Sequence, residues 1–385
     1  MTTRRRVSTV VASAGVGSDP AYGSLTPPLW TSDTYEWADP QEKPSYDYSR
    51  TVNPNRDIVA AALAELEGAA GGVLTNSGQS AALLALLLVP PGGVVVAPHD
   101  CYGGTYRLIA GLEEKRLVRA RFVDQADDAA FERAMDEKPA LLWLETPSNP
   151  LLRVVDVARR AAQAKAAGAL TVADNTLLTP CRQRPLALGC DLVMHSTTKA
   201  LNGHSDLFGG ALLLSDPELL EKAHWWANAA GLSASAHDAW QTLRGLRTLP
   251  LRVDRQEASA REIAAWLSRR SEVAAVHYPG LESDPGYELA ARQQDGPGLM
   301  LSFRVKGGGA ATKAFLDALQ LITLASSLGG FSSLICVPST MTHRGMPPEA
   351  QAEAGIDAGL LRLSVGLEAP VDLVADIERG LTAIA

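Results

Sequence analysis

Short apolar runs, each followed by small or polar residues and then by a helical pattern, recur from residue 72 to residue 214. Such runs are typical of strands that are buried on both faces of a sheet. Their alternation with helices predicts an α/β fold, with a mostly parallel sheet and helices on both of its faces. The predicted strands are Gly72–Leu74, Val94–Val96, Ala140–Leu144, Leu170–Ala173, Leu192–Met194 and Ala211–Leu214.

Polar residues stand at or just past the ends of several of these strands. In a parallel sheet a ligand binds beyond the carboxyl ends of the strands, where the following loops meet. We therefore expect one crevice to collect five residues that lie far apart in the sequence: Ser77, Tyr102, Asn149, Asp174 and Lys199.

Lys199 has the most distinctive chemistry of this set, because it directly follows Ser196, Thr197 and Thr198 at the end of an apolar run. A lysine in such a place can form a Schiff base with an aldehyde cofactor, while the hydroxyls bind the phosphate of that cofactor. An ordinary exposed lysine in a loop is the alternative that this short motif leaves open by itself.

The remaining residues match the needs of pyridoxal 5'-phosphate. Asp174 would keep the pyridine nitrogen protonated, and the pyridinium would give a buried carboxylate its cationic partner. Tyr102 would stack on the ring and assist Lys199 as acid and base, although packing in the core is the alternative for this tyrosine. Arg362 could bind a substrate carboxylate through two hydrogen bonds. Phosphate binding is predicted for the turn Ser77-Gly78-Gln79, which precedes a helix, and for Ser196 and Thr198.

The first fifty residues are rich in Pro, Ser, Thr, Tyr and Trp and show little periodicity. A long irregular lead of this kind predicts an arm that packs on a second subunit. Near its end, Tyr48 and Arg50 are suited to bind phosphate oxygens, although a solvated loop is the alternative. The start, with Arg4 to Arg6, resembles a secretory signal only weakly, because Ser and Thr interrupt its short apolar run.

Length and composition exclude several classes of protein. At 385 residues the chain exceeds the usual size of a single core, which predicts two domains. A net charge of −8 argues against a nucleic-acid partner, and no apolar window is long enough to cross a membrane. The four cysteines form no CxxC pair, so neither a disulfide framework nor a metal site is predicted, and a cytoplasmic location fits. His195 and His204 lie near Cys190, but their spacing matches no common ligand pattern.

The character of the sequence changes near residue 217. Long helices are predicted over 217–230 and 236–270, and a smaller α/β unit follows, with a strand near 299–303 and helices near 310–320 and 371–384. We expect three parts: an N-terminal arm of residues 1–50 that contacts a neighbouring subunit, a cofactor-binding large domain of residues 51–246, and a small C-terminal domain of residues 247–385.

Motifs spread over the whole chain are specific enough to indicate a family. They are Tyr48-Ser49-Arg50, Ser77-Gly78, Asp100-Cys101-Tyr102-Gly103-Gly104-Thr105, Glu145-Thr146-Pro147-Ser148-Asn149-Pro150, Asp174-Asn175-Thr176, Ser196-Thr197-Thr198-Lys199, Ser327-Leu328-Gly329-Gly330 and Met341-Thr342-His343. Together they resemble those of the pyridoxal-phosphate enzymes of cysteine and methionine metabolism, the cystathionine synthase and lyase family. Within this trans-sulfuration family, Leu201-Asn202-Gly203-His204-Ser205-Asp206 is most similar to the bacterial γ-synthases.

The resemblance implies a PLP-dependent transferase of fold type I, similar to aspartate aminotransferase, and a homotetramer built from dimers that share active sites. It implies that Tyr48 and Arg50 reach the cofactor phosphate of the neighbouring subunit. Ser327 and Asn149 would help to place the cofactor or the substrate, and Arg107 and Asp47 would belong to the substrate site. The implied reaction is a γ-replacement of methionine biosynthesis, in which O-succinylhomoserine and cysteine give cystathionine and succinate.

Two departures from the γ-synthases leave the substrate open. Thr51 stands where these enzymes have a second arginine, and Ser326 stands where they have a glutamate. Both positions are tied to the distal end of the substrate. Elimination to 2-oxobutanoate, or the activity of a cystathionine γ-lyase, methionine γ-lyase or cystathionine β-lyase, is therefore the alternative. A protein that binds the cofactor without turnover is a third possibility, but the complete set of site residues argues against it.

Overall fold

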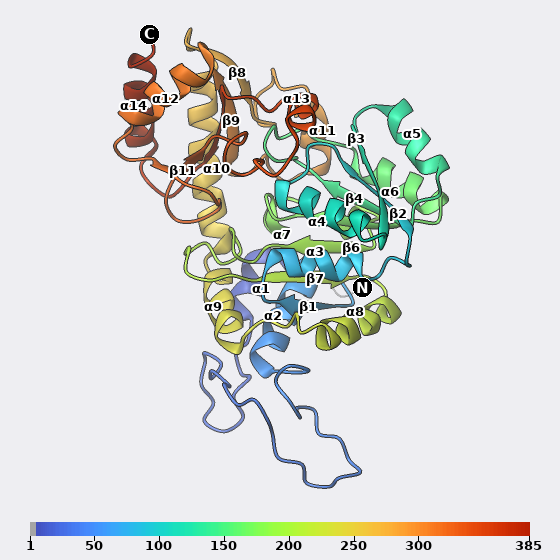
Figure 1. The fold of residues 1–385 in the computed structure, drawn as a ribbon. Coiled ribbons are helices and arrows are strands. Elements are labelled where there is room, and N and C mark those ends of the chain that lie inside the picture. Colours follow the sequence, from blue (N-terminus) through green and yellow to red (C-terminus); the bar gives the residue numbers. More distant parts are fainter. Residues whose placement is uncertain (1–4) are drawn as a thin grey trace.

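The computed structural model describes residues 5–385, so Arg4 lies outside the described residues. Its centre is a seven-stranded sheet with the strand order β1-β7-β6-β5-β4-β2-β3 (Figure 1). β7 runs antiparallel to both of its neighbours, and the pairs from β6 to β3 are parallel, which confirms the predicted α/β fold with a mostly parallel sheet. The strands are β1 (Gly71–Thr75), β2 (Gly93–Pro98), β3 (Val118–Val123), β4 (Leu141–Glu145), β5 (Leu170–Asp174), β6 (Leu192–His195) and β7 (Gly210–Leu214).

Helices cover both faces of this sheet, because its strands are apolar on both sides. One face packs against α3 (Gly78–Leu86), α4 (Gly103–Glu114) and α8 (Pro217–Ala229). The other face packs against α2 (Pro54–Glu67), α5 (Asp128–Asp136), α6 (Val157–Ala166) and α9 (Ala236–Leu246). Two short helices, the α-helix α7 (Thr179–Arg182) and the 3₁₀ helix η1 (Pro185–Leu188), connect β5 to β6.

The ends of α2 show how local sequence sets these elements. The side chain of Asn53 accepts the backbone N–H groups of Asn55 and Arg56 and so begins the helix. Gly68 ends it in the left-handed conformation, with a φ of 82°, which a residue with a side chain rarely adopts.

A second sheet of five strands forms the upper part of the molecule in Figure 1, with the order β10-β11-β12-β9-β8. Its strands are β8 (Val273–His277), β9 (Met300–Val305), β10 (Thr323–Leu324), β11 (Leu334–Cys336) and β12 (Leu360–Ser364). The accompanying helices are α11 (Tyr287–Gln293), α12 (Gly308–Ala318), α13 (Pro348–Ala354) and α14 (Pro370–Thr382). A separate core of Phe303, Phe315, Leu363 and Ile377 lies between this sheet and its helices.

The predicted long helix over 236–270 is wrong, because the structure divides it into α9 and α10 (Leu249–Leu267). Pro250 stands in the first turn of α10, where its missing N–H and fixed φ are tolerated but where they prevent a continuous helix. α10 packs in two cores: Val253 lies in a core of the seven-stranded sheet, and Ile263 lies in the core of the five-stranded sheet. The division of the chain at residues 246/247 stays a prediction.

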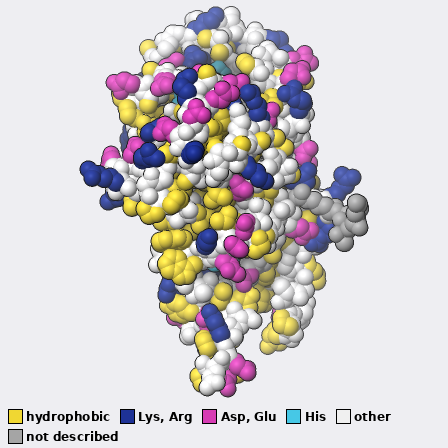
Figure 2. All heavy atoms as spheres, turned by 90° about the vertical axis from the view of Figure 1, so that its right-hand side faces the viewer, with side chains coloured by type: hydrophobic (Ala, Val, Ile, Leu, Met, Phe, Trp, Pro, Cys, Tyr) yellow, Lys and Arg dark blue, Asp and Glu magenta, His cyan; other side chains and the backbone are white. Residues whose placement is uncertain are grey.

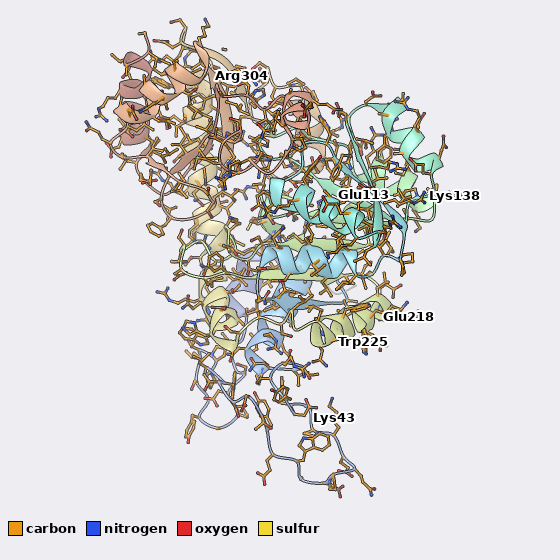
Figure 3. The ribbon with its side chains drawn as sticks, in the orientation of Figure 1. Lys43, Glu113, Lys138, Glu218, Trp225 and Arg304 are labelled. Carbon is orange, nitrogen blue, oxygen red and sulfur yellow. The ribbon has the colours of Figure 1, made fainter. Side chains whose placement is uncertain are left out.

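The described part of the N-terminal arm begins with a helix that the sequence pattern does not predict, α1 (Val7–Ser13), which buries Val10 and Val11. The following segment projects from the lower end of the molecule, and Lys43 lies in this projecting part (Figures 1 and 3). Tyr22 and Leu25 in it are 92% and 75% exposed. Figure 2 shows hydrophobic side chains gathered over the middle and lower parts of one face, as at surfaces that bind a partner. Among residues 5–385, no helix is both long and apolar enough to cross a membrane.

Candidate active site

A cavity of about 420 Å³ lies at the carboxyl ends of the parallel strands, where the loops of the large sheet meet the smaller sheet. It collects all five residues for which the sequence predicts a common crevice. Its walls contain eleven of the predicted site residues: Ser77, Gly78, Gln79, Tyr102, Asn149, Asp174, Ser196, Thr198, Lys199, Ser327 and Arg362.

Lys199 follows the carboxyl end of β6, and its Nζ donates a hydrogen bond to Ser327 Oγ at 2.8 Å. Burial, and then the positive charge of Arg362, lower the pKa of Lys199 to about 8, while Asp174 opposes this shift. A lower pKa leaves a larger fraction of the amine neutral near neutral pH, and the neutral amine is the nucleophile. The geometry therefore suits Lys199 to attack an aldehyde.

Asp174 is the last residue of β5 and pairs in register with Met194 of β6, so the two strands bring it to the cavity from which Lys199 also projects. Its carboxylate accepts the backbone N–H of Thr176 at 3.0 Å. Burial raises the pKa of Asp174, and the hydrogen bond from Thr176 and the electrostatic interactions with His195 and Lys199 oppose that shift. A carboxylate in this position would gain most from a cation bound inside the cavity, such as a pyridinium.

The turn before α3 forms a second wall of the cavity. Ser77 is the N-cap of α3 and accepts the backbone N–H of Ser80 at 3.1 Å. A Cβ on Gly78 would lie 2.7 Å from the Cβ of Ser196, so only a glycine lets the two segments approach this closely. The helix N-terminus and the hydroxyls of Ser196 and Thr198 supply donors for an anion.

Tyr102 is 37% exposed in the cavity and stands directly before α4. A Cβ on Gly104 would lie 2.4 Å from Cε1 of the Tyr102 ring, so the ring occupies space that the glycine leaves free. An accessible aromatic ring in the same cavity as Asp174 and Lys199 suits stacking on a planar ring.

Arg362 reaches the cavity from β12 of the smaller sheet and is 2% exposed. Its Nη1 donates to Asn149 Oδ1 at 2.9 Å, and its Nη2 donates to the backbone carbonyl of Ser327 at 2.8 Å. Its buried Nε has no acceptor among residues 5–385, although buried donors are almost always paired. A ligand carboxylate would satisfy this donor, as the sequence predicts for the substrate.

Four predicted site residues do not line the cavity of their own chain. Tyr48 and Arg50 belong to the N-terminal arm, where Arg50 Nη1 donates to the side chain and the backbone carbonyl of Asn228 at 2.7 and 2.8 Å. Asp47 forms an ion pair with Lys43 at 3.1 Å. Arg107 lies on the exposed side of α4, beside Gly345. Their assignment to the site stays a prediction that requires a neighbouring subunit or a movement of side chains.

Eight residues of the cavity wall are absent from the predicted set of site residues: Glu145, Thr176, Leu177, Met194, Phe208, Ser326, Leu328 and Thr342. Glu145 carries a signal that could have identified it, because it directly follows an apolar strand in the same way as the predicted residues do. Phe208 and Thr342 lie in loops without such a signal, and only the folded chain brings them to the cavity.

The residues present fit pyridoxal 5'-phosphate. Lys199 would bind its aldehyde carbon, Asp174 its ring nitrogen, Tyr102 its ring face, and the Ser77–Gln79 turn with Ser196 and Thr198 its phosphate. The fit depends on observations of this chain: a partly buried carboxylate whose pKa is raised, a lysine whose pKa is lowered, and a glycine at a helix N-terminus that allows a close approach of Ser196.

Comparisons with known proteins agree with this fit. A family model described as "Cys/Met metabolism PLP-dependent enzyme" matches residues 8–382. The chain is 48% identical to a cystathionine γ-synthase of Escherichia coli, over 98% of each chain, and 39% identical to a cystathionine γ-lyase of Bacillus subtilis, over 98% of this chain and 99% of that protein. A crystal structure of the cystathionine γ-synthase of Xanthomonas oryzae, in complex with aminoacrylate and cysteine, has a TM-score of 0.98, 48% identity and 99% coverage of both chains.

Proposed function

The chain belongs to the Cys/Met metabolism PLP-dependent enzymes and has their fold of type I, and from this premise we propose that it catalyses a γ-replacement on an activated homoserine. The thiol sulfur of cysteine would replace the succinyloxy group at Cγ of O-succinylhomoserine, so that a C–S bond forms as the Cγ–O bond breaks, and the products would be cystathionine and succinate. The observation that carries the proposal is a single cavity that combines Lys199, Asp174 and an arginine with an unpaired donor, in a chain 48% identical to a γ-synthase.

The bound cofactor would supply an electron sink that makes protons on the substrate carbons acidic. Arg362, oriented by Asn149, would bind the α-carboxylate and fix the substrate relative to Lys199. Nζ of Lys199 would then move protons at Cα and Cβ, and Tyr102 would assist as acid and base. Exclusion of water from the cavity would favour capture by the thiol over hydrolysis to 2-oxobutanoate.

The N-terminal arm supports a proposal about assembly. We propose a cytoplasmic homotetramer built from dimers, in which Tyr48 and Arg50 of each subunit bind the cofactor phosphate of its neighbour, and Asp47 and Arg107 belong to the substrate site. Two observations support this arrangement: several apolar side chains of the arm are exposed, and Tyr48 does not line the cavity of its own chain.

A lyase that cleaves cystathionine, methionine or a related amino acid is the second candidate. Ser326 lines the cavity as a neutral residue where the γ-synthases have a glutamate, so the distal end of the substrate meets a different charge. The 39% identity to a γ-lyase also supports this candidate.

One assay separates the two candidates. O-succinylhomoserine is supplied with and without cysteine, and cystathionine, succinate and 2-oxobutanoate are measured. The proposed synthase forms cystathionine when cysteine is present and 2-oxobutanoate when it is absent. Cleavage of cystathionine without any net synthesis would reject the proposal in favour of the lyase.

A further inference from the structure

Glu145 is a buried carboxylate in the cavity wall for which the proposed chemistry has no use. It ends β4, is 5% exposed, and pairs in register with Asp174 on β5. Its contacts go to two different loops: Oε2 accepts the backbone N–H of Tyr102 at 2.9 Å, and Oε1 accepts the backbone N–H of Asn149 at 3.2 Å. Both of these residues face the cofactor cavity.

We propose that Glu145 is a positioning residue, whose carboxylate fixes the stacking ring of Tyr102 and the substrate-binding pair of Asn149 and Arg362 relative to each other. Neither role requires Glu145 to touch the substrate.

The contact with Tyr102 controls the position of an aromatic ring. Tyr102 stands at the N-cap of α4, but its side chain makes no capping hydrogen bond. Its ring lies against Gly104, and the ring fits there only because Gly104 has no side chain. The hydrogen bond from its backbone to Glu145 therefore holds the residue at the point where a small rotation would move the ring across the cavity.

The contact with Asn149 controls the position of the substrate arginine. Asn149 Oδ1 accepts a hydrogen bond from Arg362, and its backbone carbonyl accepts one from Nε2 of the buried His343. Asn149 thus connects β4 of the large sheet to β12 of the smaller sheet. The N–H of Asn149 is bound to Glu145, so a displacement of the Glu145 side chain would also move Asn149 and, through it, the guanidinium of Arg362 that would bind the substrate α-carboxylate.

A space-filling role does not explain a carboxylate at this place. Burial, and then the negative charge of Asp174, raise the pKa of Glu145 well above its usual range, and the N–H groups of Tyr102 and Asn149 oppose that shift. A glutamine would fill the same volume without the cost of burying a charge. However, its amide has one acceptor oxygen, and its NH₂ group would face an N–H donor, so it could satisfy one of the two loops only.

The experiment compares Glu145→Gln with Asp376→Asn. Asp376 is a suitable control because it is 1% exposed, accepts the backbone N–H groups of Gln320, Leu321 and Ile322, and lies outside the cavity. Three quantities are measured: thermal stability without cofactor, the pH midpoint of the visible absorbance of the holoenzyme, and the affinity of the holoenzyme for glycine by the same absorbance. The inference rests on the proposed function only in requiring an amino-acid ligand. Since no reading requires turnover of O-succinylhomoserine, a wrong substrate assignment would leave these results unchanged.

We expect Glu145→Gln to weaken glycine binding by about ten-fold or more, the effect of one misplaced charge-assisted hydrogen bond, and to shift the pH midpoint. Asp376→Asn should lower thermal stability but change glycine affinity by less than about two-fold. The proposal is overturned if Glu145→Gln binds glycine as the wild type does, with the same pH midpoint.

Glu145→Asp provides a second variant in case the glutamine protein does not fold. It keeps the charge but is one methylene shorter, so it can reach one of the two N–H groups only. A loss of glycine affinity of about three-fold or more would support the positioning role, since one hydrogen bond is weakened. Wild-type affinity in this variant, or a failure of both variants to fold, would show that Glu145 is purely structural and overturn the proposal.

Discussion

The cavity around Lys199 and the arm around Arg50 both present donors for anions, but the chain holds them in opposite ways. Lys199 and Arg362 are positioned by buried strands of two sheets, and each has a side-chain or backbone partner inside the cavity. Arg50 is exposed and is held at the surface by Asn228, at the end of α8. The difference teaches that one chain by itself brings together the proposed catalytic residues around Lys199. The proposed phosphate-binding residues Tyr48 and Arg50, in contrast, could bind a cofactor only in the cavity of a neighbouring subunit.

The largest effect on turnover is expected from a change in the cavity around Lys199. Lys199→Ala should remove the yellow colour of the purified protein and reduce turnover by at least about 10²–10⁴-fold, because the variant loses the amine proposed to bind the aldehyde and to move protons. Visible absorbance with excess cofactor and the cystathionine assay measure both effects. A yellow, active variant would contradict the assignment of Lys199 and would remove the contrast between the two regions.

Asp174→Asn should have the next largest effect. The amide keeps the shape of the side chain but removes the charge that would hold the ring nitrogen protonated, so turnover should fall by about 10²–10³-fold. Stability without cofactor should stay the same or rise, because desolvation disfavours the ionised form of this carboxylate. Loss of stability together with unchanged turnover would show that Asp174 supports the fold rather than the reaction.

The lowered pKa of Lys199 predicts a pH-dependent stability of the enzyme freed of its cofactor. The folded pKa of about 8 lies below the ordinary value of 10.5, so between these values the unfolded chain binds more protons. The loss of folding stability caused by the buried ammonium group is complete below pH 8 and disappears as the pH rises to 10.5. Lys199→Met should therefore be more stable than the wild type by about 1–3 kcal/mol at pH 7, and the difference should close by pH 10.5. Denaturant titrations at several pH values test this, and a constant difference would contradict it.

For the arm we expect a smaller and more selective effect. Arg50→Ala should weaken cofactor binding by about ten-fold or more, the value of a charge-assisted hydrogen bond to phosphate. Thermal stability without cofactor should change little, since Arg50 is exposed. The control is Arg121→Ala, a half-buried arginine whose side chain is 38% exposed and pairs with Glu137. A loss of stability with unchanged cofactor affinity would mean that Arg50 serves only its contact with Asn228.

The smallest effect belongs to the ion pair within the arm. Lys43 and Asp47 lie 3.1 Å apart, but the lysine side chain is 60% exposed. Lys43→Ala should change stability by less than about 0.5 kcal/mol and leave cofactor affinity unchanged, because exposed ion pairs contribute little. Calorimetry measures the stability of this variant, and cofactor titration measures its affinity. Both values serve as the reference for the effect of Arg50→Ala. A marked loss of affinity would show that the ion pair orients Tyr48 and Arg50.

The sequence by itself determined the strands of the large sheet and the residues that follow them. Asp174 and Lys199 could be assigned to one crevice because apolar runs identify buried strands, and the carboxyl ends of parallel strands meet at one edge. These are local patterns with a fixed spatial meaning. The same rule points to Glu145, but nothing local shows that its two oxygens bind two separate loops.

Only the tertiary structure decided contacts between distant segments. The meeting of Arg362 with Asn149 depends on how the smaller sheet docks on the larger one, and the break between α9 and α10 depends on packing in two cores. The position of Arg50 outside its own cavity is a result of the same kind, since a motif shows which groups bind a phosphate but not on which chain. Periodicity specifies the elements and their buried faces, whereas the pairing of these faces depends on the shape and volume of the whole chain.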